Sequence, residues 1–121
     1  QASGGLPDRD GMGFSHHGIR HDVALTLCDG SSGDIRLERT VLKAMVDCFE
    51  LWKERQKKYG KSNIAVFGAA GCVIRLHDKL ARLRRVYFES VADTPDESTE
   101  DSGKDSVNYA VMGLVCHRGQ W

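Results

Sequence analysis

Apolar residues recur with the spacing of an α-helix in three segments of this sequence. In residues 35–59 they fall at Val41, Met45, Cys48 and Trp52, and this stripe predicts an amphipathic helix. Asp34 before the segment is a suitable N-cap residue, and glycine follows the segment at position 60, where helices commonly end.

A second stripe predicts a helix over residues 72–88. Its members are Val73, Leu76, Leu80, Leu83 and Tyr87. The stretch between the first two helices, residues 60–72, contains three glycines and is expected to be a connection.

The third helix is predicted over residues 94–116. Thr94 is expected as its N-cap, Pro95 as its first residue and Glu97 as the partner in a capping box. The apolar positions expected to face the core of this helix are Val107, Val111 and Leu114.

Three helices with short connections and little strand signal predict an all-α helical bundle over residues 34–121. Residues 1–33 are rich in glycine and poorly patterned, and they are expected to form an N-terminal arm. Three helices of this size bury a thin core, so a homodimer or homotetramer is expected.

The composition narrows the class of protein. The chain has 121 residues, which suits one domain, and its 17 basic and 17 acidic residues give no net charge. This balance argues against binding to nucleic acid or to an anionic membrane through net charge. No apolar run approaches the ~20 residues of a membrane span. The four cysteines include no C-x-x-C pair, which favours free thiols and a cytoplasmic location.

The charges are nevertheless segregated along the chain. Residues 73–88 carry five cations and one anion, whereas residues 93–105 carry six anions and one cation. Two interpretations follow. The two segments pair with each other, or they build a site in which carboxylates hold a divalent metal and arginines hold phosphates.

The interpretation as a metal site rests on a row of residues with side-chain oxygen atoms on the third predicted helix. Glu97, Asp101, Asp105 and Asn108 share one sector at ~100° per residue, and hard oxygen ligands suit Mg²⁺ or Mn²⁺. A solvated acidic face near a helix start is the alternative.

Two further sets of residues complete the candidate chemistry. On the second helix Arg75, Asp78 and Arg82 share a face, and the planar arginine fork suits phosphate oxygens; a solvated basic face is the alternative. On the first helix Glu50 and Glu54 are four residues apart and offer an opposing half of a metal site, although they lie nearly opposite the apolar stripe.

Several motifs taken together resemble the phage nucleotide modification associated domain of the first type, which is similar to MazG-like all-α nucleoside triphosphate pyrophosphohydrolases. The resemblance covers about residues 40–116. It rests on Tyr59-Gly60, Phe67-Gly68, Gly71, Arg75-Leu76-x-Asp78-Lys79-Leu80-x-Arg82-Leu83, Asp96-Glu97-Ser98 and Asp101-x3-Asp105-x2-Asn108-Tyr109-Ala110.

The resemblance implies a metal-dependent enzyme of the host cytoplasm. It would convert a (d)NTP to the monophosphate and pyrophosphate and shape the nucleotide pool for modified DNA. It implies Mg²⁺ or Mn²⁺ as cofactor and no direct contact with nucleic acid. Glu50-x3-Glu54 and Glu97-x3-Asp101-x3-Asp105 depart from the Glu-x2-Glu and Glu-x2-Asp spacing usual in the MazG-like enzymes.

Residue roles follow from this expected chemistry. Metal ions would be held by Asp101, Asp105 and a glutamate of the first helix, and a spare carboxylate would orient the attacking water. The catalytic set is Arg75, Asp78, Lys79 and Arg82, whose cations would stabilise the leaving pyrophosphate. The substrate-binding set is Tyr59, Phe67, Asn108 and Tyr109.

Two other functions remain open at this point. One is a catalytically silent protein that binds or sequesters a nucleotide without turnover. The other is a non-enzymatic partner of a nucleotide-modifying enzyme, with a charge-paired interior and no affinity for nucleotides.

Overall fold

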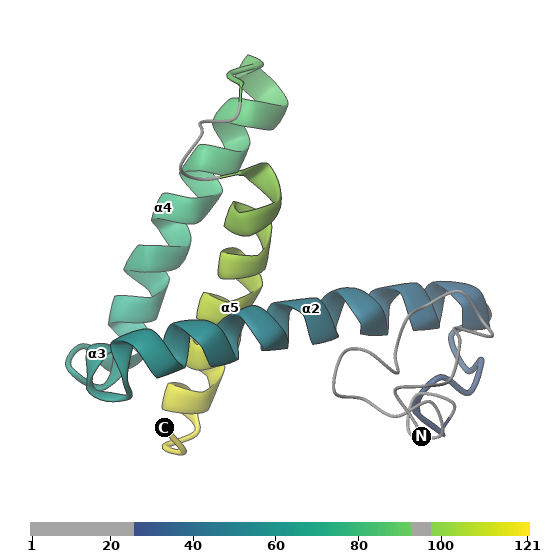
Figure 1. Cartoon of the computed structure of the whole chain (residues 1–121), viewed down its shortest axis with the longest axis horizontal. Helices are drawn as coiled ribbons and strands as arrows, with labels where there is room; N and C mark the ends of the chain where they lie inside the picture. Colours follow the sequence, from purple (N-terminus) through teal and green to yellow (C-terminus); the bar gives the residue numbers. More distant parts are fainter. Residues whose placement is uncertain (1–25, 93–97) are drawn as a thin grey trace. The chain divides into compact units, whose positions relative to one another are not determined.

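The computed structural model describes residues 26–92 and 98–121, and these residues form helices and no strand (Figure 1). The all-α prediction is therefore confirmed for the part of the chain that is described. The helices are α2 (Ile35–Tyr59), α3 (Ser62–Ala65), α4 (Gly68–Glu89) and α5 (Thr99–His117). Most of the predicted N-terminal arm lies outside the described residues.

Helix α2 begins and ends where the sequence predicts. The backbone N–H of Leu37 donates to Oδ1 of Asp34 at 3.0 Å, so Asp34 satisfies one of the free amides at the helix start. At the other end, Gly60 has a φ of +79° and its N–H donates to the carbonyl of Gln56 at 2.8 Å. Glycine adopts this left-handed conformation without strain, which explains why the helix stops there.

The chain divides into two compact units at a point inside α2. The first unit ends at Glu50, and the second comprises Leu51–Trp121. In the first unit the buried apolar side chains among the described residues are Cys28, Val46 and Cys48. The predicted domain boundary after residue 33 lies just before the start of α2, and as a domain boundary it stays a prediction.

The core of the second unit is small and lies where α4 and α5 meet near the C-terminal end of α5. Its buried members are Ile64, Cys72 and Met112, and the partly buried side chains packed on them are Trp52, Tyr109, Cys116 and Trp121. The indole N–H of Trp121 donates to the carbonyl of Lys61 at 3.0 Å, and its ring meets Trp52 edge-on with centroids 6.4 Å apart. These contacts attach the end of the chain to the α2–α3 corner.

Helices α4 and α5 lie side by side in Figure 1, and small residues allow their close approach. A Cβ atom added at Gly113 of α5 would lie 3.4 Å from Cβ of Cys72 on α4. Cys72 is buried, and its pKa is raised by the loss of hydration and by the neighbouring Cys116 thiol. Neither cysteine forms a disulfide, so both act as small apolar groups at this crossing.

The segment between α2 and α4 is more helical than its glycines predict. A short helix, α3, occupies part of it, and α4 begins at Gly68 rather than at residue 72. The glycine at position 71 has a steric role, because a Cβ there would lie only 2.7 Å from Cβ of Phe67. Glycine in this stretch therefore indicates a crowded helix start in addition to a turn.

Helix α5 begins later than predicted. Its N-cap is Ser98, whose hydroxyl accepts a hydrogen bond from the N–H of Asp101 at 3.0 Å. The predicted cap and capping box at Thr94, Pro95 and Glu97 lie outside the described residues.

The prediction that the stripe of α5 faces the core was wrong for three residues. Val107, Val111 and Leu114 are exposed, and so are Val73 and Leu80 of the predicted α4 stripe. The reason is geometric: α5 turns its small and polar residues, Ser102, Gly113 and Asn108 among them, toward α4 and the cleft described below. The expected oligomer, which would cover such faces, stays a prediction.

Candidate functional site

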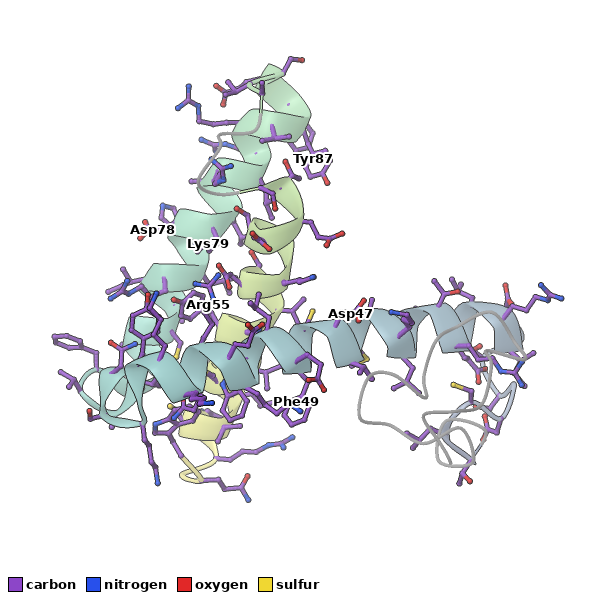
Figure 2. All side chains as sticks on the ribbon, viewed as in Figure 1. Asp47, Phe49, Arg55, Asp78, Lys79 and Tyr87 are labelled. Atoms are coloured by element: carbon purple, nitrogen blue, oxygen red, sulfur yellow. The ribbon has the colours of Figure 1, made fainter. Side chains whose placement is uncertain are left out.

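The side chains of Arg55 on α2 and Lys79 on α4, both labelled in Figure 2, form ion pairs with one buried carboxylate on α5. Asp105 is only 6% exposed. Its Oδ2 atom lies 3.2 Å from Nζ of Lys79 and 3.8 Å from Nη2 of Arg55. A carboxylate buried to this degree requires such partners, because an isolated buried charge is expensive. The three residues form a charged cluster contributed by three helices of the second unit.

This cluster opens into a polar cleft. Its lining residues are Arg55, Tyr59, Asn63, Arg75, Asp78, Lys79, Asp105 and Tyr109. Three of them are cations and two are anions, so the lining carries a net charge of one positive unit. Arg75 is exposed, and within residues 26–92 and 98–121 its side chain takes part in no hydrogen bond or ion pair. The planar guanidinium of Arg75 is thus available to a ligand, and it lies in the same cleft as Arg55 and Lys79, which both pair with Asp105.

An aromatic and amide-rich pocket adjoins the polar cleft. Its cavity volume is about 50 Å³, and it shares Arg55, Tyr59, Asn63, Asp105 and Tyr109 with the cleft. Its other lining residues are Trp52, Gln56, Gly60, Ile64, Asn108 and Met112. Three aromatic rings and three amide side chains at one site suit a flat, polar ring system, which they can hold by stacking and by hydrogen bonds.

The structure brings together most of the predicted phosphate and substrate residues. Tyr59, Arg75, Asp78, Lys79 and Tyr109 line the polar cleft, and Asn108 lines the adjoining pocket one turn beyond Asp105. The spacing on α4 explains the grouping on that helix, because residues three and four positions apart lie on one face.

Two predicted residues lie elsewhere. Arg82 donates from Nε to the hydroxyl of Ser102 at 2.9 Å, which joins α4 to α5, and it does not line the cleft. Phe67 precedes α4 with 76% of its surface exposed and is not part of either pocket. Spacing placed Arg82 on the expected face of its helix, but the structure uses it for a hydrogen bond between helices. Phe67 was expected from the chemistry of base stacking, but it is exposed.

The predicted metal ligands are not gathered at this cleft. Glu97 lies outside the described residues, Glu50 belongs to the first unit, and neither Glu54 nor Asp101 lines the cleft. Within residues 26–92 and 98–121, no three His, Cys, Asp or Glu side chains are grouped so that they could share a metal ion. Asp105 faces two cations, an environment that does not fit a metal ligand.

Sequence reasoning missed three polar lining residues, Arg55, Gln56 and Asn63. A signal for the first two exists. Trp52, Arg55, Gln56 and Tyr59 are spaced three or four apart, so they share one side of α2. Sequence reasoning did not connect Arg55 with the aromatic residues on either side of it.

No protein-family model matches the sequence, and neither a curated protein nor a solved structure is matched to it. The resemblance described above therefore stays a prediction. Within the described ranges, no helix has both the length and the apolar character that crossing a bilayer demands.

Proposed function

We propose that the second unit binds a nucleotide, with its phosphate in the polar cleft and its base in the aromatic and amide-rich pocket. The observation that carries the proposal is the shared boundary of the two pockets at Arg55, Tyr59, Asn63, Asp105 and Tyr109. A ligand that spans this boundary has an anionic end and a flat polar end. Nucleotides combine these two properties.

Each part of the cleft has a defined task in this proposal. Arg75 forms charge-assisted hydrogen bonds to phosphate oxygens, and Arg55 and Lys79 add positive charge beside it. Tyr59 and Tyr109 supply faces on which a base stacks, and Asn63 and Asn108 supply donors and acceptors for its edge.

Two arginines of α4 provide a matched test. Arg75 and Arg84 are both exposed on the same helix, but only Arg75 lines the cleft. Binding of each common nucleoside monophosphate and triphosphate would be measured by calorimetry or NMR titration. Arg75→Ala is expected to weaken binding about tenfold, the equivalent of about 1.4 kcal/mol, whereas Arg84→Ala leaves it unchanged. Equal effects of the two variants would contradict the proposal.

A second variant separates the two ends of the ligand. Tyr59→Leu removes a stacking face without altering charge, so nucleotide binding is expected to weaken several-fold while inorganic phosphate binds as before. If both probes weaken together, Tyr59 supports the cleft as a whole rather than a base.

The pyrophosphohydrolase implied by the resemblance is a second proposal. It rests on the resemblance over about residues 40–116 and on the cations Arg55, Arg75 and Lys79 that line the cleft. The test is incubation with each NTP and dNTP plus Mg²⁺ or Mn²⁺ and chromatography of the products. Monophosphate and pyrophosphate from a subset of bases would support an enzyme, whereas binding without products would support a protein that only sequesters the nucleotide.

A further inference from the structure

Asp105 has an unusual position for a residue of a phosphate-binding cleft, because it contributes a negative charge at its centre. Its carboxylate is buried, and Oδ2 is shared by Lys79 at 3.2 Å and Arg55 at 3.8 Å. The pairing keeps two flexible cationic side chains directed toward the cleft. Oδ2 of Asp105 thus lies between the same two cations that a bound phosphate oxygen would contact.

The charge of the lining limits the ligand. Arg55, Arg75 and Lys79 oppose Asp78 and Asp105, which leaves one positive unit. A phosphate monoester carries about −1.5 to −2 charges at neutral pH, close to what this lining can balance together with solvent. A triphosphate adds the charge of two more phosphates and would leave most of its charge unbalanced without metal ions.

We infer that Asp105 is an internal counter-ion that competes with the ligand, and that the cleft recognises a single phosphate monoester through protein cations without a metal ion. The inference rests on the proposed nucleotide-binding function and specifies its ligand. Arg55 and Lys79 exchange part of their interaction with Asp105 for the phosphate oxygens, and Arg75 completes the set. Asp105 therefore lowers the affinity for phosphate while holding the empty site together.

The substitution Asp105→Asn distinguishes this role from that of a metal ligand. It keeps the shape of the side chain but removes the competing charge, so inorganic phosphate and the four deoxynucleoside monophosphates are expected to bind about tenfold more tightly in EDTA. If Asp105 were a metal ligand, the opposite result would be expected. The wild type would then bind these ligands only with Mg²⁺, and Asp105→Asn would bind them more weakly. Glu100→Gln is the control, because it removes an equal charge from an exposed position on α5 and is expected to leave affinity unchanged.

Wild-type protein provides the second measurement, which does not depend on the folding of a variant. In EDTA, each monophosphate is expected to bind at least as tightly as the corresponding triphosphate, and Mg²⁺ is expected to leave monophosphate affinity unchanged. Triphosphates that bind more than about tenfold tighter in EDTA would overturn the inference.

The outcomes separate the inference from the function on which it rests. Wild-type binding that weakens in Asp105→Asn, or that requires Mg²⁺, overturns the counter-ion role but leaves nucleotide binding intact. If neither the wild type nor the variant binds any phosphate or nucleotide, the proposed function fails and the inference fails with it.

Discussion

The Nε atom of Arg82 on α4 donates a hydrogen bond to the hydroxyl of Ser102 on α5, and the Ser102 side chain is fully buried. The bond crosses the two helices that position Lys79 and Asp105. Ser102→Ala is expected to lower the free energy of unfolding of this unit by about 1–2 kcal/mol, because a charged donor loses its buried acceptor. Urea titration followed by circular dichroism measures this change.

Ser106 provides the control for that substitution. Its hydroxyl donates only to the carbonyl of Ser102 in its own helix at 2.8 Å. Ser106→Ala is expected to change the stability by less than about 0.5 kcal/mol, since alanine favours the helix and no contact between helices is lost. A larger loss in Ser106→Ala than in Ser102→Ala would contradict the role assigned to Arg82.

Replacing glycine by alanine is expected to have opposite effects on stability at two helical positions. At Gly71 a new Cβ would meet Cβ of Phe67 at 2.7 Å, whereas at Gly103 it would meet nothing within 4 Å. Gly103→Ala is expected to stabilise the protein by up to about 1 kcal/mol through helix propensity. Gly71→Ala is expected to cancel or reverse that gain, because the start of α4 must shift. Thermal unfolding of both variants under one condition gives the comparison.

Trp121 provides a test of how the end of the chain is attached. Trp121→Phe keeps an aromatic ring against Trp52 but removes the donor to the carbonyl of Lys61, so a loss of about 1 kcal/mol is expected. Trp121→Ala also removes the ring contact and is expected to cost about 1–3 kcal/mol. Equal stability of the wild type and both variants would show that this attachment contributes nothing to the fold.

Acid stability is predicted to depend on Glu38 in the first unit. Its carboxylate accepts hydrogen bonds from the hydroxyl of Ser32 and from the N–H groups of Gly30 and Ser32, and these bonds lower its pKa from the ordinary value of 4.5. Because the folded-state pKa is the lower one, this stabilisation is fully present above pH 4.5 and is lost as the pH falls through the folded value.

Glu38→Gln is the corresponding variant. It is expected to unfold with a weaker dependence on pH in the acid range than the wild type, and carboxyl NMR titration of the wild type should show Glu38 titrating below 4.5. A Glu38 titration at or above that value would contradict the hydrogen-bonded arrangement at the start of α2.

Much of the fold follows from local signals. Asp34 and Gly60 set the bounds of α2, because a cap side chain and a left-handed glycine act within a few residues. The start of α4 could not be predicted in the same way. There the glycine at position 71 serves a contact with Phe67, and sequence patterns do not distinguish that use from a turn.

The candidate site was predictable helix by helix but not as a whole. Arg75 and Asp105 were singled out from spacing on their own helices, and Lys79 and Tyr109 from the resemblance and the chemistry it implies. The pairing of Asp105 with Arg55 joins α2 to α5 across 50 residues, and no local pattern specifies such a contact. The acidic row that predicts metal binding therefore ends in a carboxylate, Asp105, that is paired with two cations.

The buried thiols give this chain built-in reporters of transient opening. Cys28 and Cys48 lie in the first unit and Cys72 lies in the second, so each unit protects at least one sulfur from a water-borne reagent. A labelling reagent can reach these atoms only when the surrounding unit opens. The rate at which each cysteine is labelled thus measures how often its own unit opens, and unequal rates would show that the two units open independently.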